Sequence, residues 1–272
     1  MSNHEKYDRL NQIMDSYTKE DTAVAFSGGT DSSLLLHLAA EHAKLHHTRV
    51  LAITIHTELH PMNDLDISRQ LASKMGVELA VLELNELIEA GIEDNPANRC
   101  YLCKKLLFTQ AKKFAMDRNI FCIMDGTNAD DLLVYRPGLQ ALKELGIKSP
   151  LMEAGFSKRD VRTLATERGI SVADRPSAPC LATRFPYGDQ LTLDKLHKVD
   201  EGENYLKTLG LYNVRIRVHG NIARIEVDLQ NMNIILEQKD NITIFLKNLG
   251  YRYITLDLEG FQSGSMDIDI IK

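Results

Sequence analysis

Residues 22–43 read TAVAFSGGTDSSLLLHLAAEHA. A short apolar run enters a glycine-rich turn and leaves it with apolar residues at helical spacing, which predicts a β-strand, a tight loop and an α-helix. Two glycines let the backbone approach an anion because no Cβ intervenes. The free N–H groups and positive dipole end of the helix, together with hydroxyl side chains, favour phosphate. The predicted phosphate-binding residues are Ser27, Gly28, Gly29, Thr30, Asp31 and Ser32.

Asp31 is the acidic residue of this loop. A carboxylate beside bare phosphate is unfavourable, so we expect Asp31 to orient Mg²⁺ or a ribose. The loop lacks the Gly-Lys-Ser/Thr ending of a Walker sequence and is therefore a different kind of phosphate loop. The alternative interpretation is a Gly-Ser turn that caps a helix and binds no ligand.

The first half of the chain alternates strand-like and helix-like runs. Further strands are predicted at 49–55, 78–83 and 120–124, and helices at 64–76, 100–118 and 158–169. This alternation predicts an α/β fold, with a parallel sheet covered on both faces. Right-handed crossovers then place the loops that follow the strands along one edge of the sheet.

Asp125, Gly126 and Thr127 directly follow the strand predicted at 120–124 and open the segment DGTNADD. We therefore expect them at the same sheet edge as the glycine-rich loop, where they help to enclose the same ligand. The alternative is that Asp, Gly and Asn form an ordinary turn here.

The second half of the chain has a different pattern. Residues 171–188 are irregular and Pro-rich. From about residue 190 we expect a helix, a strand pair around His219-Gly220-Asn221, a helix to Leu249 and a last strand in YITLDL. The sequence thus predicts a smaller C-terminal α+β domain, and we divide the chain into domains at 1–178 and 179–272.

The composition narrows the class of protein. The chain has 272 residues, of which 44% are apolar and 26% charged, and its formal net charge is −6. These fractions exclude a wholly disordered chain, and the net charge supplies no field that attracts nucleic acid or an anionic membrane. No run approaches the roughly 20 apolar residues of a membrane span, and the charged N-terminus has no signal-peptide core. We expect a cytoplasmic protein with neither nucleic acid nor membrane as partner.

Four cysteines stand at positions 100, 103, 122 and 180. In a reducing compartment they are metal ligands, catalytic thiols or core residues rather than disulfides. Cys100 and Cys103 share one helix face, so both thiols can reach one metal. Cys180 lies on a distant irregular segment, where Arg184 favours its thiolate. Cys122, inside a predicted strand, is expected to be a small buried hydrophobe.

Cys100, Cys103 and Cys180 together leave a fourth coordination position open. A structural zinc site normally fills all four positions with Cys or His, whereas three thiolates suit a [4Fe–4S] cluster with one accessible iron. A redox pair or a chance C-x-x-C remains the alternative for Cys100 and Cys103.

The glycine-rich loop resembles the PP-loop signature SGGxDS of the N-type ATP pyrophosphatases, which grip the β,γ-pyrophosphate of ATP and transfer AMP to a substrate oxygen. More of the chain resembles the LarE family, ATP-dependent sulfur transferases that build the nickel-pincer nucleotide cofactor of lactate racemase and its relatives. The matching stretches are AFSGGTDSSLLL, DGTNADD, YRPGLQALKELGIKSPL, SAPCLATRFPYG, VRIRVHGNIARIE and GYRYITLDLEGFQSG.

The LarE resemblance implies an activity. Residues 1–178 form the PP-loop adenylation domain, which uses ATP with Mg²⁺, and residues 179–272 serve substrate binding, sulfur transfer and oligomerisation. ATP adenylylates a carboxylate of pyridinium-3,5-biscarboxylic acid mononucleotide and releases pyrophosphate. A sulfur nucleophile then displaces AMP to leave a thiocarboxylate, and the cycle repeats on the second carboxylate. The resemblance also implies a nickel-inserting enzyme downstream and a homo-oligomer, including a hexamer.

The resemblance implies two sources of sulfur. In single-cysteine members, the cysteine at the position of Cys180 donates its own sulfur and is left as dehydroalanine. In three-cysteine members, the additional pair at the positions of Cys100 and Cys103 binds a [4Fe–4S] cluster with that cysteine, and the open iron carries sulfide obtained from a separate source. We expect the cluster variant here.

Further site residues follow from the resemblance. Arg215 and Arg217 alternate on a predicted strand and share a face, where guanidinium groups bind substrate phosphate or carboxylates. Glu203 matches a family position near the sulfur-transfer site, and Lys104 and Arg184 are further catalytic candidates. The alternative for Glu203 and the two strand arginines is a solvated face with a surface ion pair. The sequence departs from the family at Gln262, where GF-x-SG is expected to hold arginine.

Two other functions compete with this one. A PP-loop tRNA thiolase uses the same adenylation chemistry, but tRNA binding usually needs a broad basic surface. An ATP-binding sensor whose cysteines hold structural zinc is the alternative that is not an enzyme.

Overall fold

The computed structural model describes residues 3–61, 64–133, 136–176 and 179–266. The chain divides into two compact units. The first unit comprises Met1–Thr57, Met62–Ala90 and Cys100–Ser177, and the second comprises Glu58–Pro61, Gly91–Arg99 and Ala178–Lys272. Two short segments from the first half of the sequence thus belong to the second unit. The predicted domain boundary lies between 178 and 179, and the first unit ends at Ser177. Ser177 and Ala178 themselves are outside the described residues.

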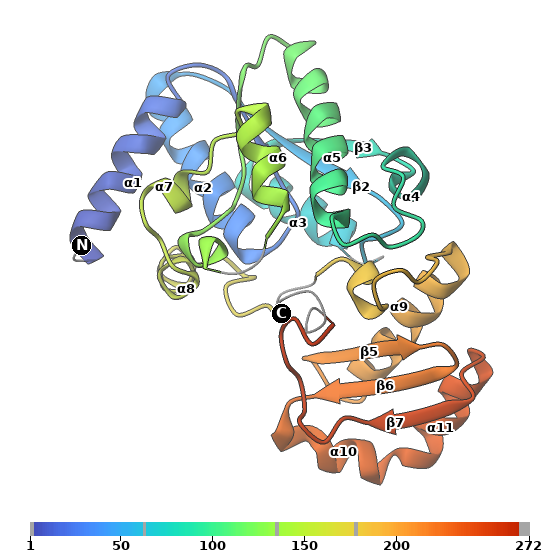
Figure 1. Ribbon diagram of the computed structural model, residues 1–272. Coiled ribbons are helices and arrows are strands. Elements are labelled where there is room, and N and C mark those ends of the chain that lie inside the picture. The colour runs from blue at the N-terminus through green and yellow to red at the C-terminus, as the bar shows by residue number, and fades with distance from the viewer. Residues whose placement is uncertain (1–2, 62–63, 134–135, 177–178, 267–272) are drawn as a thin grey trace. The chain divides into compact units, whose positions relative to one another are not determined.

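The first unit is built on a four-stranded sheet with the order β3-β2-β1-β4 (Figure 1). Its strands are β1 (Thr22–Ala25), β2 (Val50–His56), β3 (Glu78–Glu83) and β4 (Cys122–Met124). All three pairings are parallel, and Val24 lies opposite both Ala52 and Met124. Parallel strands need a crossover connection between each pair, and helices make these connections and bury both faces of the sheet. The parallel sheet therefore confirms the predicted α/β fold.

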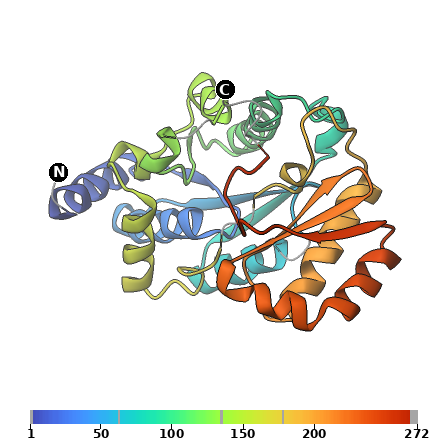
Figure 2. The same ribbon diagram turned by 60° about the horizontal axis from the view of Figure 1, so that its bottom comes forward.

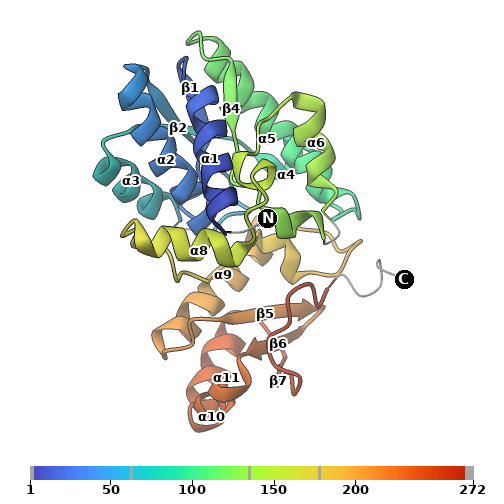
Figure 3. The same cartoon turned by 90° about the vertical axis from the view of Figure 1, so that its left-hand side faces the viewer.

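Helices cover both faces of this sheet (Figure 3). Their bounds are α1 Asn3–Tyr17, α2 Thr30–His46, α3 Asp64–Met75, α4 Glu86–Glu89, α5 Arg99–Met116, η1 Ala129–Leu132, α6 Gly138–Leu145, α7 Pro150–Glu153 and α8 Lys158–Glu167. Successive residues of β1 pack on opposite faces of the sheet. Val24 packs with α1, α2, α3 and α8, whereas Ala23 packs with α5 and α6. This two-residue period follows from the pleat of the strand.

The second unit contains a three-stranded mixed sheet, β5-β6-β7 (Figure 2). Its elements are η2 Leu181–Arg184, α9 Leu193–Thr208, β5 Val214–His219, β6 Ile222–Val227, η3 Leu229–Asn231, α10 Met232–Glu237, α11 Lys239–Asn248 and β7 Tyr253–Leu256. β5 and β6 pair antiparallel and β6 and β7 parallel. Helices α9 and α11 pack on this sheet, which confirms the predicted C-terminal α+β region.

The elements differ from the predicted ones in a few places. The single helix expected before Leu249 is two helices, α10 and α11, and α6 and α7 were not predicted because both are short. Among the described residues, no helix combines the length and the apolar character needed to cross a membrane.

Candidate functional site

The glycine loop, residues 27–32, and the segment 125–128 leave neighbouring strands at the same sheet edge. β1 pairs with β2 on one side and β4 on the other, so the order of the chain reverses between β1 and β4. In open parallel sheets, ligands bind beyond the carboxyl ends of the strands at such a reversal. The topology therefore brings the two predicted ligand loops to the location where an α/β sheet binds a nucleotide.

Gly28 requires its glycine. Its φ of +69° lies in the left-handed region, and a Cβ would lie 2.7 Å from Ser68 Oγ of α3. The hydroxyls of Ser27 and Ser32 lie 3.2 Å apart and hold the loop closed. Gly29 caps α2 without a side-chain hydrogen bond, so a bound anion can supply the missing acceptor for the helix N-terminus.

Gly126 packs directly on this loop. A Cβ at Gly126 would lie 2.8 Å from the backbone nitrogen of Ser32, at the first turn of α2. Asp125 is held in turn by Ser149, whose hydroxyl donates to Oδ1 at 2.5 Å, and by the hydroxyl of Thr127. The 125–128 segment and the glycine loop therefore form one packed surface, in which backbone approaches backbone.

Thr30 and Asp31 lie at the start of α2 and differ in their contacts. The hydroxyl of Thr30 donates to the carbonyl of Val172 at 2.7 Å, so it ties α2 to the chain after α8. The side chain that we expected to face phosphate is thus already engaged. Asp31 receives a hydrogen bond from Lys158 at 3.4 Å on Oδ2, whereas its Oδ1 is buried and accepts none from the described residues. An unpaired carboxylate oxygen fits Mg²⁺, which prefers oxygen ligands.

Three cations stand around this edge. Lys104 of α5, which the sequence analysis named as a catalytic candidate, places its Nζ 4.0 Å from Asp125 Oδ2. The sequence analysis missed the other two. Lys158 begins α8, and Arg175 bridges Asp64 at 2.6 Å and the Gly28 carbonyl at 3.5 Å. No local spacing marks them, because α8 and the segment after it reach this edge only through the tertiary fold.

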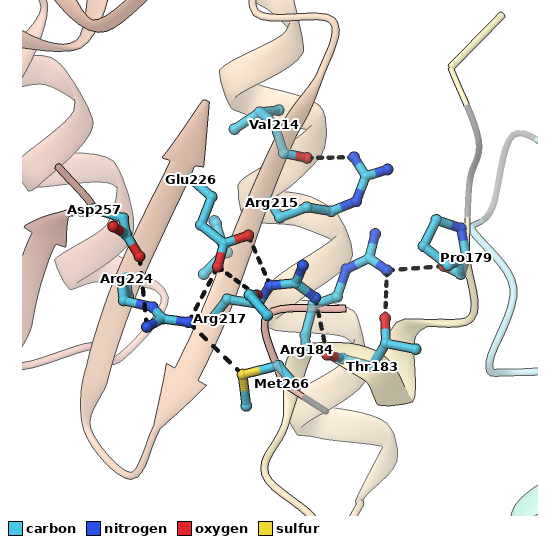
Figure 4. A network of polar contacts seen from close by, with 12 residues as sticks. Pro179, Thr183, Arg184, Val214, Arg215, Arg217, Arg224, Glu226, Asp257 and Met266 are labelled. Carbon is cyan, nitrogen blue, oxygen red and sulfur yellow. Dashed lines mark hydrogen bonds and ion pairs between the residues drawn. The ribbon is translucent and has the colours of Figure 1, made fainter. Parts of the chain in front are cut away.

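Cys180 stands at the N-terminus of η2 in the second unit, and its thiol is half-buried. Its carbonyl accepts from the Thr183 hydroxyl at 2.8 Å and from Arg184 Nη1 at 3.3 Å. Arg184 also donates to the Pro179 carbonyl at 2.9 Å (Figure 4). Arg184 thus fixes the backbone around Cys180. Its stabilisation of the Cys180 thiolate stays a prediction.

Arg184 and Glu203 form a bidentate ion pair. Nε and Nη2 of Arg184 each donate to a separate Glu203 oxygen at 2.8 Å, and both side chains are 2% exposed. The backbone N–H of Ile216 in β5 donates to the same carboxylate. Burial raises the pKa of Glu203, but attraction to Arg184 and these hydrogen bonds outweigh it and hold the pKa below its usual range. The pair links the Cys180 segment to α9 and β5.

Arg215 and Arg217 share one face of β5, as predicted, and are 3% and 4% exposed. The alternative of a solvated face is therefore wrong. Arg217 donates to Glu226 at 3.0 Å and to the Thr183 carbonyl at 3.0 Å, while the Arg215 guanidinium lies 5.2 Å from the ring centre of Phe261. Burial, followed by repulsion from Arg184, lowers the pKa of Arg215 to about 10.

Glu226 is the shared hydrogen-bond acceptor of several side chains around it (Figure 4). It is fully buried and accepts from Arg217, from Arg224 at 3.1 Å and from the Ser265 hydroxyl at 2.7 Å. Arg224 also pairs with Asp257 at 3.5 Å. Neither Glu226 nor Ser265 was singled out from the sequence, although the alternation of Arg224 and Glu226 along β6 was a usable signal.

The cysteines fall in both units. Cys100 and Cys103 lie near the N-terminus of α5 in the first unit, exposed and half-buried respectively, and Cys180 belongs to the second unit. Cys122 is half-buried and packs against the core, and burial raises the pKa of its thiol to about 11. Within the parts of the chain that the structure describes, no group of three or more His, Cys, Asp or Glu is placed to hold a metal ion.

Comparison with known proteins agrees with the geometry of the first unit. Residues 2–132 match the model of the PP-loop domain. The pyridinium-3,5-bisthiocarboxylic acid mononucleotide synthase of Lactiplantibacillus plantarum is 37% identical over 249 residues, which cover 92% of this chain and 90% of that protein.

Two further relatives carry no assigned activity. An uncharacterized protein of Synechocystis is 36% identical, covering 95% of this chain and 97% of its own length. An uncharacterized protein of Methanocaldococcus jannaschii is 31% identical, covering 93% and 95%. The likeness to the Lactiplantibacillus synthase extends over nearly the whole of both chains and includes the PP-loop. The chain therefore belongs to the LarE family of PP-loop proteins.

Proposed function

We propose that the chain is an ATP-dependent sulfurtransferase of nickel-pincer nucleotide biosynthesis. It adenylylates the carboxylates of pyridinium-3,5-biscarboxylic acid mononucleotide and converts them to thiocarboxylates. The observation that carries this proposal is the nucleotide edge formed by the glycine loop and Gly126, in a chain that matches a synthase of the bisthiocarboxylic product over nine-tenths of its length.

Adenylation is assigned to the first unit. The backbone of Gly28 and Gly29 and the free N–H groups of α2 bind the pyrophosphate of ATP. Asp31, whose Oδ1 has no hydrogen-bond partner among the described residues, would hold Mg²⁺, which neutralises phosphate charge when it is bound. Lys104 places positive charge near the phosphates, where it stabilises the charge that develops as pyrophosphate leaves. Lys158 adds positive charge that favours the binding of ATP. A substrate carboxylate oxygen attacks the α-phosphorus, which forms the acyl-adenylate and releases pyrophosphate.

Sulfur transfer is assigned to Cys180 and its surroundings. We place the anionic groups of the substrate near Arg215 and Arg217, which keep their positive charge in a buried setting and suit carboxylate or phosphate. Arg184 and Glu203, which we listed as catalytic candidates, act in this proposal by holding Cys180. The nucleophilic sulfur attacks the acyl carbon and AMP leaves with the bonding electrons, so that a thiocarboxylate remains.

The sulfur source is proposed to be a [4Fe–4S] cluster held by Cys100, Cys103 and Cys180. No three metal ligands stand together among the described residues, so this part of the proposal is carried by two observations along the chain. Cys100 and Cys103 lie one helical turn apart on α5, with at least partly accessible thiols. Asn95 and Arg99, just before Cys100, hydrogen-bond to carbonyls at 182, 185 and 186, just after Cys180. When bound, such a cluster supplies an open iron that carries exchangeable sulfide.

The proposal places the protein in the cytoplasm as a homo-oligomer, fed by a sulfide source and followed by a nickel-inserting enzyme. It involves neither nucleic acid nor membrane. The LarE match over both units supports this assignment over a tRNA thiolase or a zinc-holding sensor.

The test is anaerobic reconstitution with iron and sulfide, followed by ATP and the pyridinium dicarboxylate nucleotide. We expect thiocarboxylate by mass spectrometry, with one AMP and one pyrophosphate for each carboxylate converted. Cys180→Ser removes the product but keeps pyrophosphate release, and Cys122→Ser is the matched control that keeps both. Pyrophosphate release without thiolated product from the loaded wild type would contradict the proposal, and tight salt-sensitive tRNA binding would favour the thiolase.

A further inference from the structure

Gly138 begins α6 and packs on the side chain of Lys104 within the first unit. A Cβ at Gly138 would lie 2.7 Å from Cδ and 3.2 Å from Cγ of Lys104, and 3.1 Å from the carbonyl oxygen of Cys100. The φ of Gly138 lies outside the left-handed region, unlike that of Gly146 at the other end of the same helix. An alanine would otherwise suit a helix better, so the glycine at this position provides space for its neighbours.

Two weak contacts orient the ammonium end of Lys104. Its Nζ lies 4.0 Å from Asp125 Oδ2 and 5.7 Å from the ring centre of Phe108. The first distance is too long for a hydrogen bond, and the second is a cation–π contact of a side chain that is 32% exposed. Packing along the stem, at Cγ and Cδ, therefore has a large share in deciding where the charge lies.

The carboxylate that Lys104 approaches is itself held in place beside the glycine loop. Asp125 Oδ1 accepts from the Ser149 hydroxyl at 2.5 Å. Gly126 follows it in the chain, at the position where a Cβ would lie 2.8 Å from the backbone nitrogen of Ser32. A charge held against Asp125 is therefore held beside the first turn of α2, where the phosphates are proposed to bind.

The other end of α6 is tied to α5 by side chains. Glu144 of α6 accepts from the hydroxyl of Tyr101 at 2.9 Å and from Lys105, and Lys112 donates to the Leu145 carbonyl at 2.8 Å. These contacts hold the two helices together. A new Cβ at the start of α6 therefore displaces the flexible lysine stem more easily than it separates the helices.

We propose that Gly138 is the positioning residue of Lys104 in adenylation. The missing Cβ leaves the room in which the lysine stem passes the start of α6, so that its ammonium lies beside Asp125 at the nucleotide edge. This inference rests on the adenylation part of the proposed function. Gly138 acts through the position of one charge, and such a charge stabilises the leaving pyrophosphate most when it is in place in advance.

The test is a double-variant cycle with Gly138→Ala and Lys104→Met. The methionine removes the charge and keeps a stem that passes the same point. The kcat and the KM for ATP are measured from pyrophosphate release with the pyridinium dicarboxylate nucleotide, and urea denaturation gives the stability of each protein. Gly146→Ala is the matched control, because it strains the backbone of the same helix with no atom near its Cβ.

Gly138→Ala is expected to lower kcat about tenfold or more and to change the KM for ATP less than about twofold, because a displaced charge affects the transition state more than binding. Lys104→Met lowers kcat about 100-fold. Adding Gly138→Ala to Lys104→Met lowers kcat no further, because no charge is left to displace. Gly146→Ala keeps the kcat of the wild type although its urea midpoint falls.

An unchanged kcat in Gly138→Ala would overturn the proposal. An equal fall in kcat in the Lys104→Met background would also overturn it, since the effect would then act on the fold and not through the lysine. If Gly138→Ala does not fold, the double variant Gly138→Ala/Lys104→Ala decides: recovery of folding locates the steric conflict at the lysine stem, and no recovery contradicts it.

The proposed function fails in a different way. If the wild type releases no pyrophosphate with ATP and the nucleotide substrate, adenylation itself is wrong and the role of Gly138 falls with it. Release by the wild type, with no effect of Gly138→Ala, removes the positioning role alone.

Discussion

The nucleotide edge of the first unit and the arginine-carboxylate network of the second unit are built by opposite means. The edge consists of backbone, glycines and small hydroxyls, and leaves an oxygen of Asp31 that accepts no hydrogen bond from the residues that the structure describes. The network consists of charged side chains, Arg184, Arg217, Glu203 and Glu226, that are almost fully buried and paired with one another. The first arrangement is ready to receive a ligand, whereas the second mainly fixes its own chain.

This difference separates two effects of substitution. A change at the nucleotide edge disturbs a close backbone approach and affects binding before it affects folding. A change in the network leaves a buried charge without its partner, so it affects the folding of the second unit and, through it, the position of Cys180.

The largest effect is expected from Arg184→Met. It leaves the Glu203 carboxylate buried and unpaired, which costs about 3–5 kcal/mol in free energy of unfolding. The double variant Arg184→Met/Glu203→Leu removes both charges and is expected to be more stable than the single one. Urea denaturation of all three proteins measures this, and equal losses in the single and double variants would show that the ion pair is not what stabilises the segment.

Gly126→Ala tests the nucleotide edge. The new Cβ meets the Ser32 nitrogen and pushes the two loops apart, and a displacement of this size lowers pyrophosphate release about 100-fold. Urea stability should fall less than in Arg184→Met. Gly146→Ala is the control that loses stability without loss of ATP binding, because Gly146 caps α6 with a φ of +70°, where an alanine strains the backbone although no atom crowds its Cβ. Unchanged ATP affinity in Gly126→Ala would place the nucleotide elsewhere.

The pH dependence of stability follows from Glu203. Its pKa is lowered in the folded state, so the unfolded state binds the proton first as the pH falls. The contribution of the pair is fully present above the ordinary glutamate pKa of about 4.3 and is lost as the pH falls through the folded-state value. Stability in this range should drop by up to about 1.4 kcal/mol per pH unit for this one proton. Glu203→Gln removes that slope. An identical loss of stability at acidic pH in the variant and the wild type, measured by urea denaturation, would contradict the assignment.

Lys158→Met is expected to have the smallest effect. The Lys158–Asp31 pair is partly exposed, so its loss weakens ATP binding by about 0.2–1 kcal/mol. The KM for ATP therefore rises up to about fivefold, and kcat changes little. Steady-state kinetics of pyrophosphate release check this. The control is Lys195→Met, which replaces a half-buried lysine of the second unit that donates to the Gln190 carbonyl. A kcat that falls with KM unchanged would instead give Lys158 a role in the transition state.

The fold was largely predictable because its signals are local. The apolar run before Ser27, the glycines and the helical spacing after Asp31 all lie within 22 residues of sequence, counted over 22–43. The parallel sheet followed from the strand-helix alternation. The membership of 58–61 and 91–99 in the second unit was not predictable, because it depends on backbone hydrogen bonds such as Leu181 to Leu59 that carry no sequence pattern.

The candidate site was predictable at glycines, because the lack of a Cβ is itself the property that the position requires. Gly28 was singled out because a residue without a Cβ allows close backbone approach, and Gly28 has such a close contact. Gly126 was named only as part of DGTNADD, and its close packing on Ser32 was not predicted. The burial and pairing of Arg184 with Glu203 could not be read, because the partners are 19 residues apart on different elements and a charged residue is ordinarily exposed.

The central claim is that ATP-driven activation at the nucleotide edge is joined to sulfur delivered by a renewable centre at Cys180. The most direct measurement is mass spectrometry of both protein and product after the loaded enzyme is incubated with excess ATP, nucleotide substrate and sulfide. The account predicts more than one thiocarboxylate per chain, with Cys180 unchanged in mass. One sulfur delivered per chain, with Cys180 converted to dehydroalanine, would contradict it.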